Sequence, residues 1–367
     1  MRYLVKILSP IIGEVLGQLN GEFPMDEAVI EVLPKNSTFV SVESYGSSAW
    51  TTTGRVTARD VDGTQKAYFL KVAYGEHGRI MLNGEWESSK AIHELMPGFV
   101  PEPLGFGRYK LKKPATWFYL CEFIDMDLET APDPVDFTAK VSELHKTSRS
   151  PTGKFGFHVT TCDGKIPHVV TWEENWANFF ARLLTCVCKL DLETNGPWPE
   201  FERATAQIVT KVVPRLLGDL QTEGRQIKPC LIHGDLYEGN VGINIEMGDS
   251  ILYDVGSYYA HNEMDLGQWR LEFSSVFRSK LYTHHYLQNY AAAEPTDEFD
   301  DRNRLYSLEG TINYSAGHPG SSLRKTAYNN MCYLCEKFAP INGIDTYDAK
   351  SDPSITGARI KMHEGLI

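Results

Sequence analysis

The sequence lacks an apolar run long enough to cross a membrane. A transmembrane helix needs about 18 consecutive apolar residues, and no stretch of the 367 residues meets this requirement. The apolar start, residues 1–19, is interrupted by Pro10, Gly13 and Glu14, and no small-residue cleavage site follows it. We therefore expect a short amphipathic lead-in rather than a signal peptide, and no membrane partner.

The sequence also lacks an excess of positive charge. Its formal net charge is −12 at pH 7. A protein that binds nucleic acid over its surface must neutralise phosphates with Lys and Arg. Nucleic acid is therefore not expected as a partner.

Cysteine is scarce, and the number of cysteines is odd. The seven cysteines are scattered over the chain, a pattern typical of reduced thiols in a cytoplasmic protein. Cys332 and Cys335 form a lone C-x-x-C with no second pair and no adjacent histidine. Buried helix packing is the favoured interpretation of this pair over a zinc or redox site.

What the chain does contain is enough apolar material for more than one core. A length of 367 residues predicts two domains or lobes at about 150 residues each. A hydrophobic content of 42% with 11% aromatic residues excludes a largely disordered chain. There is no internal repeat or low-complexity tract.

The first third has the alternating pattern and turn residues of β-strands. A helix is expected to begin at an Asn83 N-cap and to end at Pro97-Gly98. The strands are expected within residues 40–45, 50–57, 67–72, 100–107 and 116–124.

Beyond an acidic, proline-containing stretch at residues 125–134 the pattern becomes helical. Asp133-Pro134 has the form of an N-cap followed by a proline at N1. Thr171 and Glu174 resemble a capping box before a long aromatic helix face. We expect an α+β protein of two unequal lobes, 1–124 and 125–367.

The most informative stretch is H-G-D-x-x-x-x-N, which begins at His233. Asp235 precedes Asn240 by five residues, and Asp254 follows at the end of an apolar run. Phosphoryl transfer needs a carboxylate to accept the hydroxyl proton and oxygen ligands for magnesium. Although all of these residue types also occur in solvated turns, their combined spacing matches a kinase catalytic loop. It predicts Asp235 as the base and Asn240 and Asp254 as metal ligands.

Further features lie upstream of this motif, in the order that a kinase requires. Lys71 ends a strand and is expected to reach the nucleotide phosphates. Glu85 in the next helix is its expected partner, with Glu87 as the alternative. The turn Gly46-Ser47-Ser48 lies where backbone N–H groups would cover the phosphates. Near the end of the last strand, Glu122 and Ile124 are expected to offer a carbonyl and an N–H to the adenine.

Several longer segments resemble the fructosamine-3-kinase and ribulosamine-3-kinase family. His233 to Asn240 resembles its H-G-D-L-W-x-G-N signature, with Tyr237 where the family has Trp. Further similar segments are Gly84-Glu85, Val100 to Pro103, Gly153 to His158 and Tyr258 to Leu266. The similarity runs from about Val40 to Asp265 and is specific as an ordered set.

This resemblance implies a protein-kinase-like fold of the aminoglycoside-phosphotransferase branch: a small antiparallel-sheet N-lobe with one helix and a larger, mainly helical C-lobe. It implies ATP and Mg²⁺ as cofactors and the 3-hydroxyl of a ketoamine as acceptor, on a protein or a free amine. Tyr237 and His233 are assigned to the substrate side, although His233 is expected to be structural rather than the base. A monomer or weak homodimer is expected.

Three alternatives remain open. The protein could be another small-molecule kinase of the same fold, or a nucleotide-binding pseudokinase that serves as an interaction module. A nucleic-acid binder ranks third because of the charge. The acidic run 294–301, in the tail after Gly267, is expected to be a solvated turn.

Overall fold

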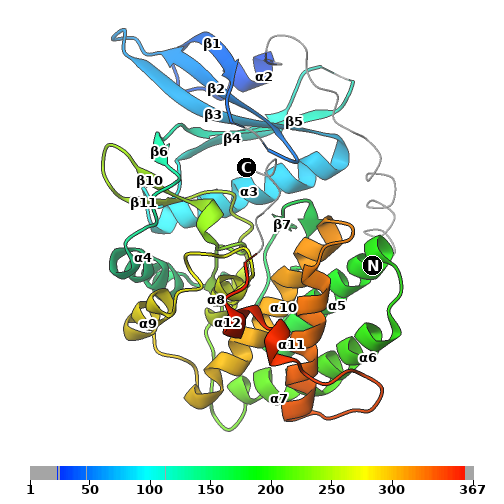
Figure 1. Ribbon diagram of the computed structural model, residues 1–367. Coiled ribbons are helices and arrows are strands. Elements are labelled where there is room, and N and C mark those ends of the chain that lie inside the picture. Colours follow the sequence, from blue (N-terminus) through cyan, green and yellow to red (C-terminus); the bar gives the residue numbers. More distant parts are fainter. Residues whose placement is uncertain (1–22, 24, 47, 112, 360–367) are drawn as a thin grey trace. The chain divides into compact units, whose positions relative to one another are not determined.

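The computed structural model describes residues 23, 25–46, 48–111 and 113–359 (Figure 1). The expected lead-in at 1–19 and Ser47 lie outside the described residues. Two lobes, 1–124 and 125–367, were expected, and the chain forms two compact units. The first holds the described residues up to Asn83 together with Pro103–Phe123, and the second holds Gly84–Glu102 and the residues from Ile124 onward.

The first unit is built on one five-stranded antiparallel sheet with the order β1-β2-β3-β5-β4. In β3 the buried Leu70 and Val72 face the core, so the intervening Lys71 points to the opposite face. A short helix, α2 (Glu27–Ile30), adds Val29 to the same core. The strands are β1 (Thr38–Ser44), β2 (Thr52–Arg59), β3 (Gln65–Tyr74), β4 (Pro103–Arg108) and β5 (Thr116–Glu122).

The helix α3 (Gly75–Leu95) begins earlier than the sequence predicted. Gly75 has a φ of 71° and allows a sharp turn directly after β3. Asn83, the expected N-cap, therefore lies inside the helix. The chain passes from the first unit to the second within α3, at Gly84.

The second unit is mainly helical (Figure 1). Its α-helices are α4 (Pro134–Thr147), α5 (Trp176–Asn195), α6 (Pro199–Gln207), α7 (Val213–Leu217), α8 (Glu263–Gly267), α9 (Lys280–Asn289), α10 (Phe299–Gly317), α11 (Leu323–Phe338) and α12 (Pro353–Thr356). One π-helical turn, η2 (Ile208–Val212), joins α6 to α7. Its 3₁₀ turns are η3 (Asp219–Gln221), η4 (Glu238–Asn240), η5 (Gln268–Arg270), η6 (Thr296–Glu298) and η7 (Ala349–Ser351).

Short strand pairs complete the second unit. They are β6 (Met126–Asp127), β7 (Cys162–Asp163), β8 (Ile166–Pro167), β9 (Cys230–Leu231), β10 (Val241–Asn244), β11 (Ser250–Leu252) and β12 (Tyr259–Ala260). β11, β10 and β6 form one small sheet, β12 pairs with β9, and β7 pairs with β8.

Helix starts show which local signals were decisive. The Asp133 side chain accepts hydrogen bonds from the N–H groups of Val135 and Asp136, which confirms the predicted cap of α4. The predicted capping box at Thr171 is wrong. Glu173 forms a β-bridge with Phe155, so this segment is extended and α5 begins at Trp176 with Asn175 as its cap. The aromatic face of α5 is buried, as expected for core packing.

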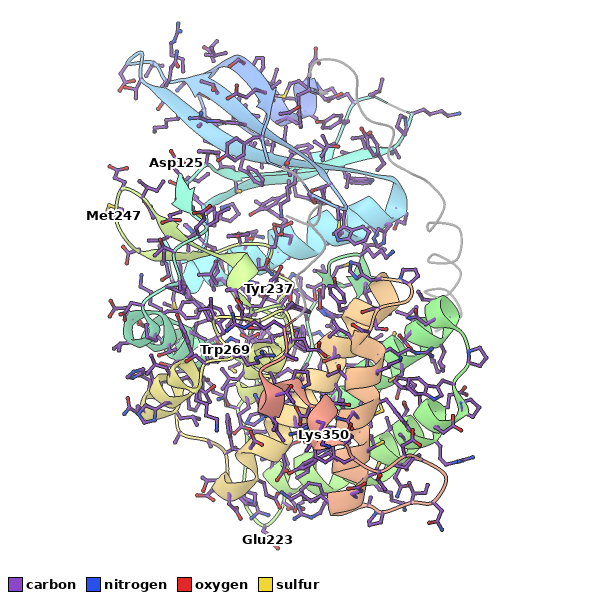
Figure 2. The ribbon with its side chains drawn as sticks, in the orientation of Figure 1. Asp125, Glu223, Tyr237, Met247, Trp269 and Lys350 are labelled. Carbon is purple, nitrogen blue, oxygen red and sulfur yellow. The ribbon has the colours of Figure 1, made fainter. Side chains whose placement is uncertain are left out.

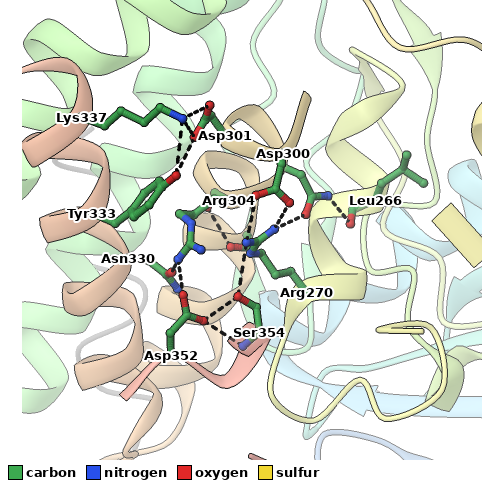
Figure 3. Close-up of polar contacts among 12 residues, drawn as sticks. Leu266, Arg270, Asp300, Asp301, Arg304, Asn330, Tyr333, Lys337, Asp352 and Ser354 are labelled. Atoms are coloured by element: carbon green, nitrogen blue, oxygen red, sulfur yellow. Dashed lines mark hydrogen bonds and ion pairs between the residues drawn. The ribbon is translucent and has the colours of Figure 1, made fainter. Parts of the chain in front are cut away.

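The C-terminal part is more ordered than a solvated acidic tail. Asp301 lies in the first turn of α10, is 4% exposed, and binds Lys337 at 2.8 Å. Arg304, one turn later, binds Asp352 and Asn330 (Figure 3). The expectation of a solvated turn at 294–301 is therefore wrong for the residues that enter α10.

The expected helix packing of the Cys332 and Cys335 pair is confirmed. All seven cysteines are free, and Cys332 and Cys335 are buried on α11. Within the described ranges no helix is long and apolar enough to cross a membrane.

Candidate active site

The predicted catalytic loop is anchored by a buried carboxylate. β9 pairs with β12 and leads into the loop that begins at Ile232. Asp265, 1% exposed at the start of α8, accepts the backbone N–H groups of His233 at 2.8 Å and Gly234 at 3.0 Å. Burial alone would raise the pKa of Asp265, but the hydrogen bond and charge of His145 outweigh it and lower this pKa. An ionised Asp265 therefore fixes the loop backbone.

The glycine of the H-G-D motif is required by packing. Gly234 has a φ of 93°, and a Cβ there would lie 2.3 Å from the carbonyl oxygen of Gly256. The Gly256 N–H in turn donates to the His233 carbonyl at 3.0 Å. The two segments that carry Asp235 and Asp254 are thus in direct backbone contact.

His233 links the same two segments through its ring. Its Nδ1 accepts the Asp235 N–H at 3.2 Å, so its Nε2 carries the proton and donates to the Tyr253 carbonyl at 3.0 Å. Burial lowers its pKa. The ring is fully buried and both nitrogens are used, which fits the expected structural role rather than a general base.

Asn240 is positioned beside Asp235 and next to Asp254. Its Nδ2 donates to the Asp235 carbonyl and to Asp235 Oδ2, both at 2.9 Å. Val241 pairs with Leu252 in the β10–β11 hairpin, so Asn240 and Asp254 meet at one end of it. Asp254 is exposed and has a φ of 53°, a backbone conformation that is rare outside glycine and concentrated at functional sites.

Asp235 has the electrostatics of a general base poised near neutral pH. Burial raises its pKa, the hydrogen bond from Asn240 opposes this, and the negative charges of Asp254 and Asp265 raise it further, to about 7. A catalytic base works best when its pKa is close to the working pH. The geometry thus gives the candidate base a suitable proton affinity.

Tyr237 lies on the loop between Asp235 and Asn240 (Figure 2). It is half-buried, and its ring meets Phe273 edge-on with centroids 5.2 Å apart. The neighbouring Glu238 fixes the segment that carries Phe273, because its carboxylate accepts Ser274 Oγ and the Val276 N–H, both at 2.8 Å. Glu238 therefore ties the loop to the chain after η5.

The other predicted residues belong to other elements of the chain. Gly46 and Ser48 lie in the β1–β2 connection, where Ser48 Oγ accepts the N–H groups of Trp50 and Thr51. Lys71 lies in β3 opposite Thr53 and Tyr119, and Glu122 ends β5. Glu85 lies on α3, in the part of this helix that belongs to the second unit. Ile124 also belongs to the second unit and precedes β6.

The donor set fits a magnesium ion. Magnesium prefers hard oxygen ligands and takes only one or two from protein, with phosphate and water supplying the rest. Because Asn240 Nδ2 is committed to Asp235, the amide oxygen remains for a cation, and Asp254 adds a carboxylate. Among the described residues no three His, Cys, Asp or Glu side chains form a ready-made metal centre.

Sequence reasoning missed the residues that hold the site. Asp265 entered only as part of a resembling segment, and His145 was not singled out. His145 bonds Asp265 at 3.1 Å and Tyr286 Oη at 2.8 Å. No local pattern marks these partners, since they come from α4, α8 and α9.

Comparison with known proteins decides the family. The model of the family described as fructosamine kinase matches residues 37–331, which is most of the chain. The chain belongs to the fructosamine kinase family. The expectation of a kinase is thereby confirmed.

Two curated relatives are similar over about two thirds of the chain. A protein-ribulosamine 3-kinase of Oryza sativa subsp. indica, named as chloroplastic, is 27% identical over 252 residues, or 68% of this chain and 67% of the relative. A ketosamine-3-kinase of Mus musculus is 28% identical over 285 residues, or 70% and 85% of the two chains.

Solved structures confirm the kinase-like fold of this family member. A Haemophilus somnus 129PT protein assigned to the fructosamine-3-kinases covers 83% of this chain with a TM-score of 0.63 and 17% identity, and 96% of its own length is matched. Choline kinase LicA of Streptococcus pneumoniae covers 85% of this chain, with 97% of its own length matched, a TM-score of 0.53 and 15% identity. The predicted α+β fold class is confirmed.

Proposed function

We propose that this protein transfers the γ-phosphate of ATP to the 3-hydroxyl of ketoamines, the adducts formed when glucose or ribose condenses with an amine. The observation that carries the proposal is the group of Asp235, Asn240 and Asp254 at one end of the β10–β11 hairpin, where Asn240 Nδ2 binds Asp235 Oδ2 at 2.9 Å. Family membership and the names of the relatives support the acceptor class.

Asp235 accepts the proton of the acceptor hydroxyl as its oxygen attacks the γ-phosphorus. The new O–P bond forms while the bond to the ADP oxygen breaks. Asn240 and Asp254 would hold magnesium, which neutralises the phosphate charge when bound. His233 and Asp265 keep the loop in place and take no proton from the substrate.

For the nucleotide, we assign the phosphates to Lys71 and to the backbone of Gly46, Ser47 and Ser48. Glu85 is the proposed partner of Lys71. The alternative, Glu87, already binds His158 at 3.1 Å and Lys90 at 3.3 Å.

The adenine edge is assigned to the backbone of Glu122 and Ile124, at and after the end of β5. A cytoplasmic location and a monomer or weak homodimer stay as predictions.

Phosphorylation at C3 has a chemical consequence. Once the ketoamine enolises toward C1, the C3 phosphate becomes a leaving group, the adduct breaks down and the amine is released. The proposed reaction is therefore a repair step that removes sugar from glycated amines.

Mass spectrometry tests this proposal directly. Fructosylated and ribosylated peptides are incubated with ATP and magnesium, and each is followed for addition of one phosphate and then for loss of the sugar. A choline and aminoglycoside panel serves as the control for other acceptors. Phosphorylation of the panel but of neither glycated peptide would contradict the ketoamine assignment.

A further inference from the structure

A second carboxyl group lies beside the proposed base without any partner of its own. Asp163 ends β7, and the carbonyl of the preceding Cys162 would lie 2.3 Å from a Cβ at Gly256. The β7–β8 hairpin therefore packs directly on the segment that follows Asp254. Within the described ranges, no hydrogen bond or ion pair joins Asp163 to another residue, and its side chain is only partly buried.

A third carboxyl group, Glu309, lies on α10, and α10 contacts the β7–β8 hairpin through β8. Glu309 is 1% exposed, and neither of its carboxylate oxygens has a hydrogen-bond partner. Burial and the charge of Asp235 raise its pKa to about 7. Burial and then the charges of Asp235 and Glu309 raise the pKa of Asp163. The charge of Asp235 thus acts on both groups, and the contact between Cys162 and Gly256 places the β7–β8 hairpin on the segment that follows Asp254.

Ring contacts place α10 at the same site independently of charge. Tyr237 of the catalytic loop meets Phe273, and Phe273 meets Tyr314 of α10, with both pairs of centroids 5.2 Å apart. The neighbouring Asn313 is 3% exposed and its Nδ2 has no partner. Asn313 lies one turn after Glu309, so both lie on one face of α10. The helix that carries Tyr314 therefore also carries buried polar atoms without hydrogen-bond partners, namely both Glu309 oxygens and Asn313 Nδ2.

Buried carboxyl groups with negative neighbours call for a cation. A ketoamine carries one in the required place, because its nitrogen is a secondary amine that is protonated near neutral pH. That nitrogen is bonded to C1, which only the carbonyl carbon separates from C3 and its reacting hydroxyl. A ketoamine whose 3-hydroxyl faces Asp235 therefore brings its ammonium group close to the neighbouring carboxylates.

We propose that Asp163 binds the ammonium group of the ketoamine and that Glu309 adds negative charge to the same subsite. This inference rests on the proposed function and specifies its substrate class, namely acceptors with a cationic nitrogen beside the phosphorylated hydroxyl. Asp163 is a specificity-determining residue in this account, since it can touch a ligand. Glu309 is enclosed and acts through the charge it contributes.

The test compares two acceptors with one sugar. The first is a fructosylated or ribosylated amine, and the second is the same compound acetylated on nitrogen, which is a neutral amide. Asp163→Asn should raise the KM for the cationic acceptor by about tenfold to a hundredfold, the loss expected for a hydrogen bond to a charged group. The KM for the neutral acceptor and for ATP should stay unchanged, as should kcat.

A matched control is Asp249→Asn, which removes an exposed carboxylate paired with Lys140 on the β10–β11 turn. It should leave both acceptor KM values unchanged. Glu309→Gln should raise the KM for the cationic acceptor by a smaller factor than Asp163→Asn. A further comparison needs no variant. The unaltered enzyme should have a lower KM for the cationic acceptor than for the neutral one.

The outcomes separate this inference from the proposed function. If the unaltered protein phosphorylates neither acceptor, the proposed function is wrong and the subsite falls with it. If it phosphorylates both with equal KM, or if Asp163→Asn raises the KM for both acceptors equally, only the ammonium subsite is wrong. A change confined to the KM for ATP or to the magnesium requirement would assign Asp163 to the nucleotide side and overturn the proposal.

Discussion

The first turns and the middle of helix α10 differ in how buried charges are paired. In its first turns each buried charge has a partner of opposite sign: Arg302 binds Glu263 at 2.7 Å, and Arg304 binds Asp352 at 2.7 Å (Figure 3). Farther along the same helix, Glu309 is equally buried and neither of its oxygens has a hydrogen bond. Asp163, whose pKa is raised by burial and by the charges of Asp235 and Glu309, also has no hydrogen-bond or ion-pair partner within the described ranges.

This difference separates structural charge from functional charge. Removing a carboxylate from water costs several kcal/mol, and a buried arginine with good geometry offsets that cost. The first turns of α10 show that the fold can supply such partners. A site that leaves its carboxyl groups uncompensated retains a desolvation cost that a cationic ligand can offset.

The largest effect is expected at the proposed base. Asp235→Asn keeps the size of the side chain but removes its ability to accept a proton. We expect kcat to fall by roughly 10²–10⁴, while the KM for ATP and the unfolding midpoint stay close to their original values. Steady-state kinetics with thermal unfolding checks this, and a variant with normal turnover would remove Asp235 from the role of base.

Breaking the ion pair between Arg304 and Asp352 should lower the stability of the fold rather than the activity. Asp352→Ala leaves Arg304 buried at 3% exposure without its carboxylate, and it also removes the acceptor of Tyr347 Oη at 2.6 Å. We expect a loss of about 3–5 kcal/mol in the free energy of unfolding, measured by urea denaturation. Asp348→Ala, at an exposed cap of η7, is the control with a smaller expected loss. Equal losses in the two variants would contradict the contrast.

Removing the charge of Glu309 should raise the stability at neutral pH, whereas removing Asp352 lowers it. Its pKa is raised from 4.5 to about 7, so the folded state binds a proton more tightly than the unfolded state. The stability linked to this group is present below about pH 4.5 and is lost as the pH rises through about 7. At about 1.4 kcal/mol per pKa unit the loss is about 3 kcal/mol.

Glu309→Gln should therefore flatten the fall in stability between pH 5 and 8 by about that amount. Urea denaturation at several pH values in this window measures the effect. If the variant and the original protein lose stability in parallel, Glu309 ionises as easily as an exposed glutamate. The contrast between Glu309 and the paired charges in the first turns of α10 is then wrong.

The sequence predicted the site where its chemistry is local. Asp235, Asn240 and Asp254 belong to one loop and the hairpin that follows it, so their spacing alone indicated that they meet. The sheet and the kinase-like fold class were also predictable, because alternating strands and Asp133-Pro134 are local signals.

The parts that failed depend on tertiary packing. Glu309 lies among polar residues of α10 that in sequence resemble a solvated helix, yet nearly every residue of α10 is buried by its neighbours. Asp265 is joined to the loop by contacts that no spacing rule describes. Thr171 had the chemistry of a helix cap, but the bridge between Phe155 and Glu173 held the nearby chain extended.

The smallest effect is expected at Tyr237, where the family signature has Trp. In the described structure its ring contacts Phe273, while its hydroxyl makes no hydrogen bond to protein. Tyr237→Phe should therefore leave stability unchanged. If the hydroxyl meets the sugar, the acceptor KM should rise about two- to tenfold, as for one neutral hydrogen bond. An unchanged KM would show that only the ring face serves the acceptor, and Tyr237→Trp would then isolate the contribution of that face.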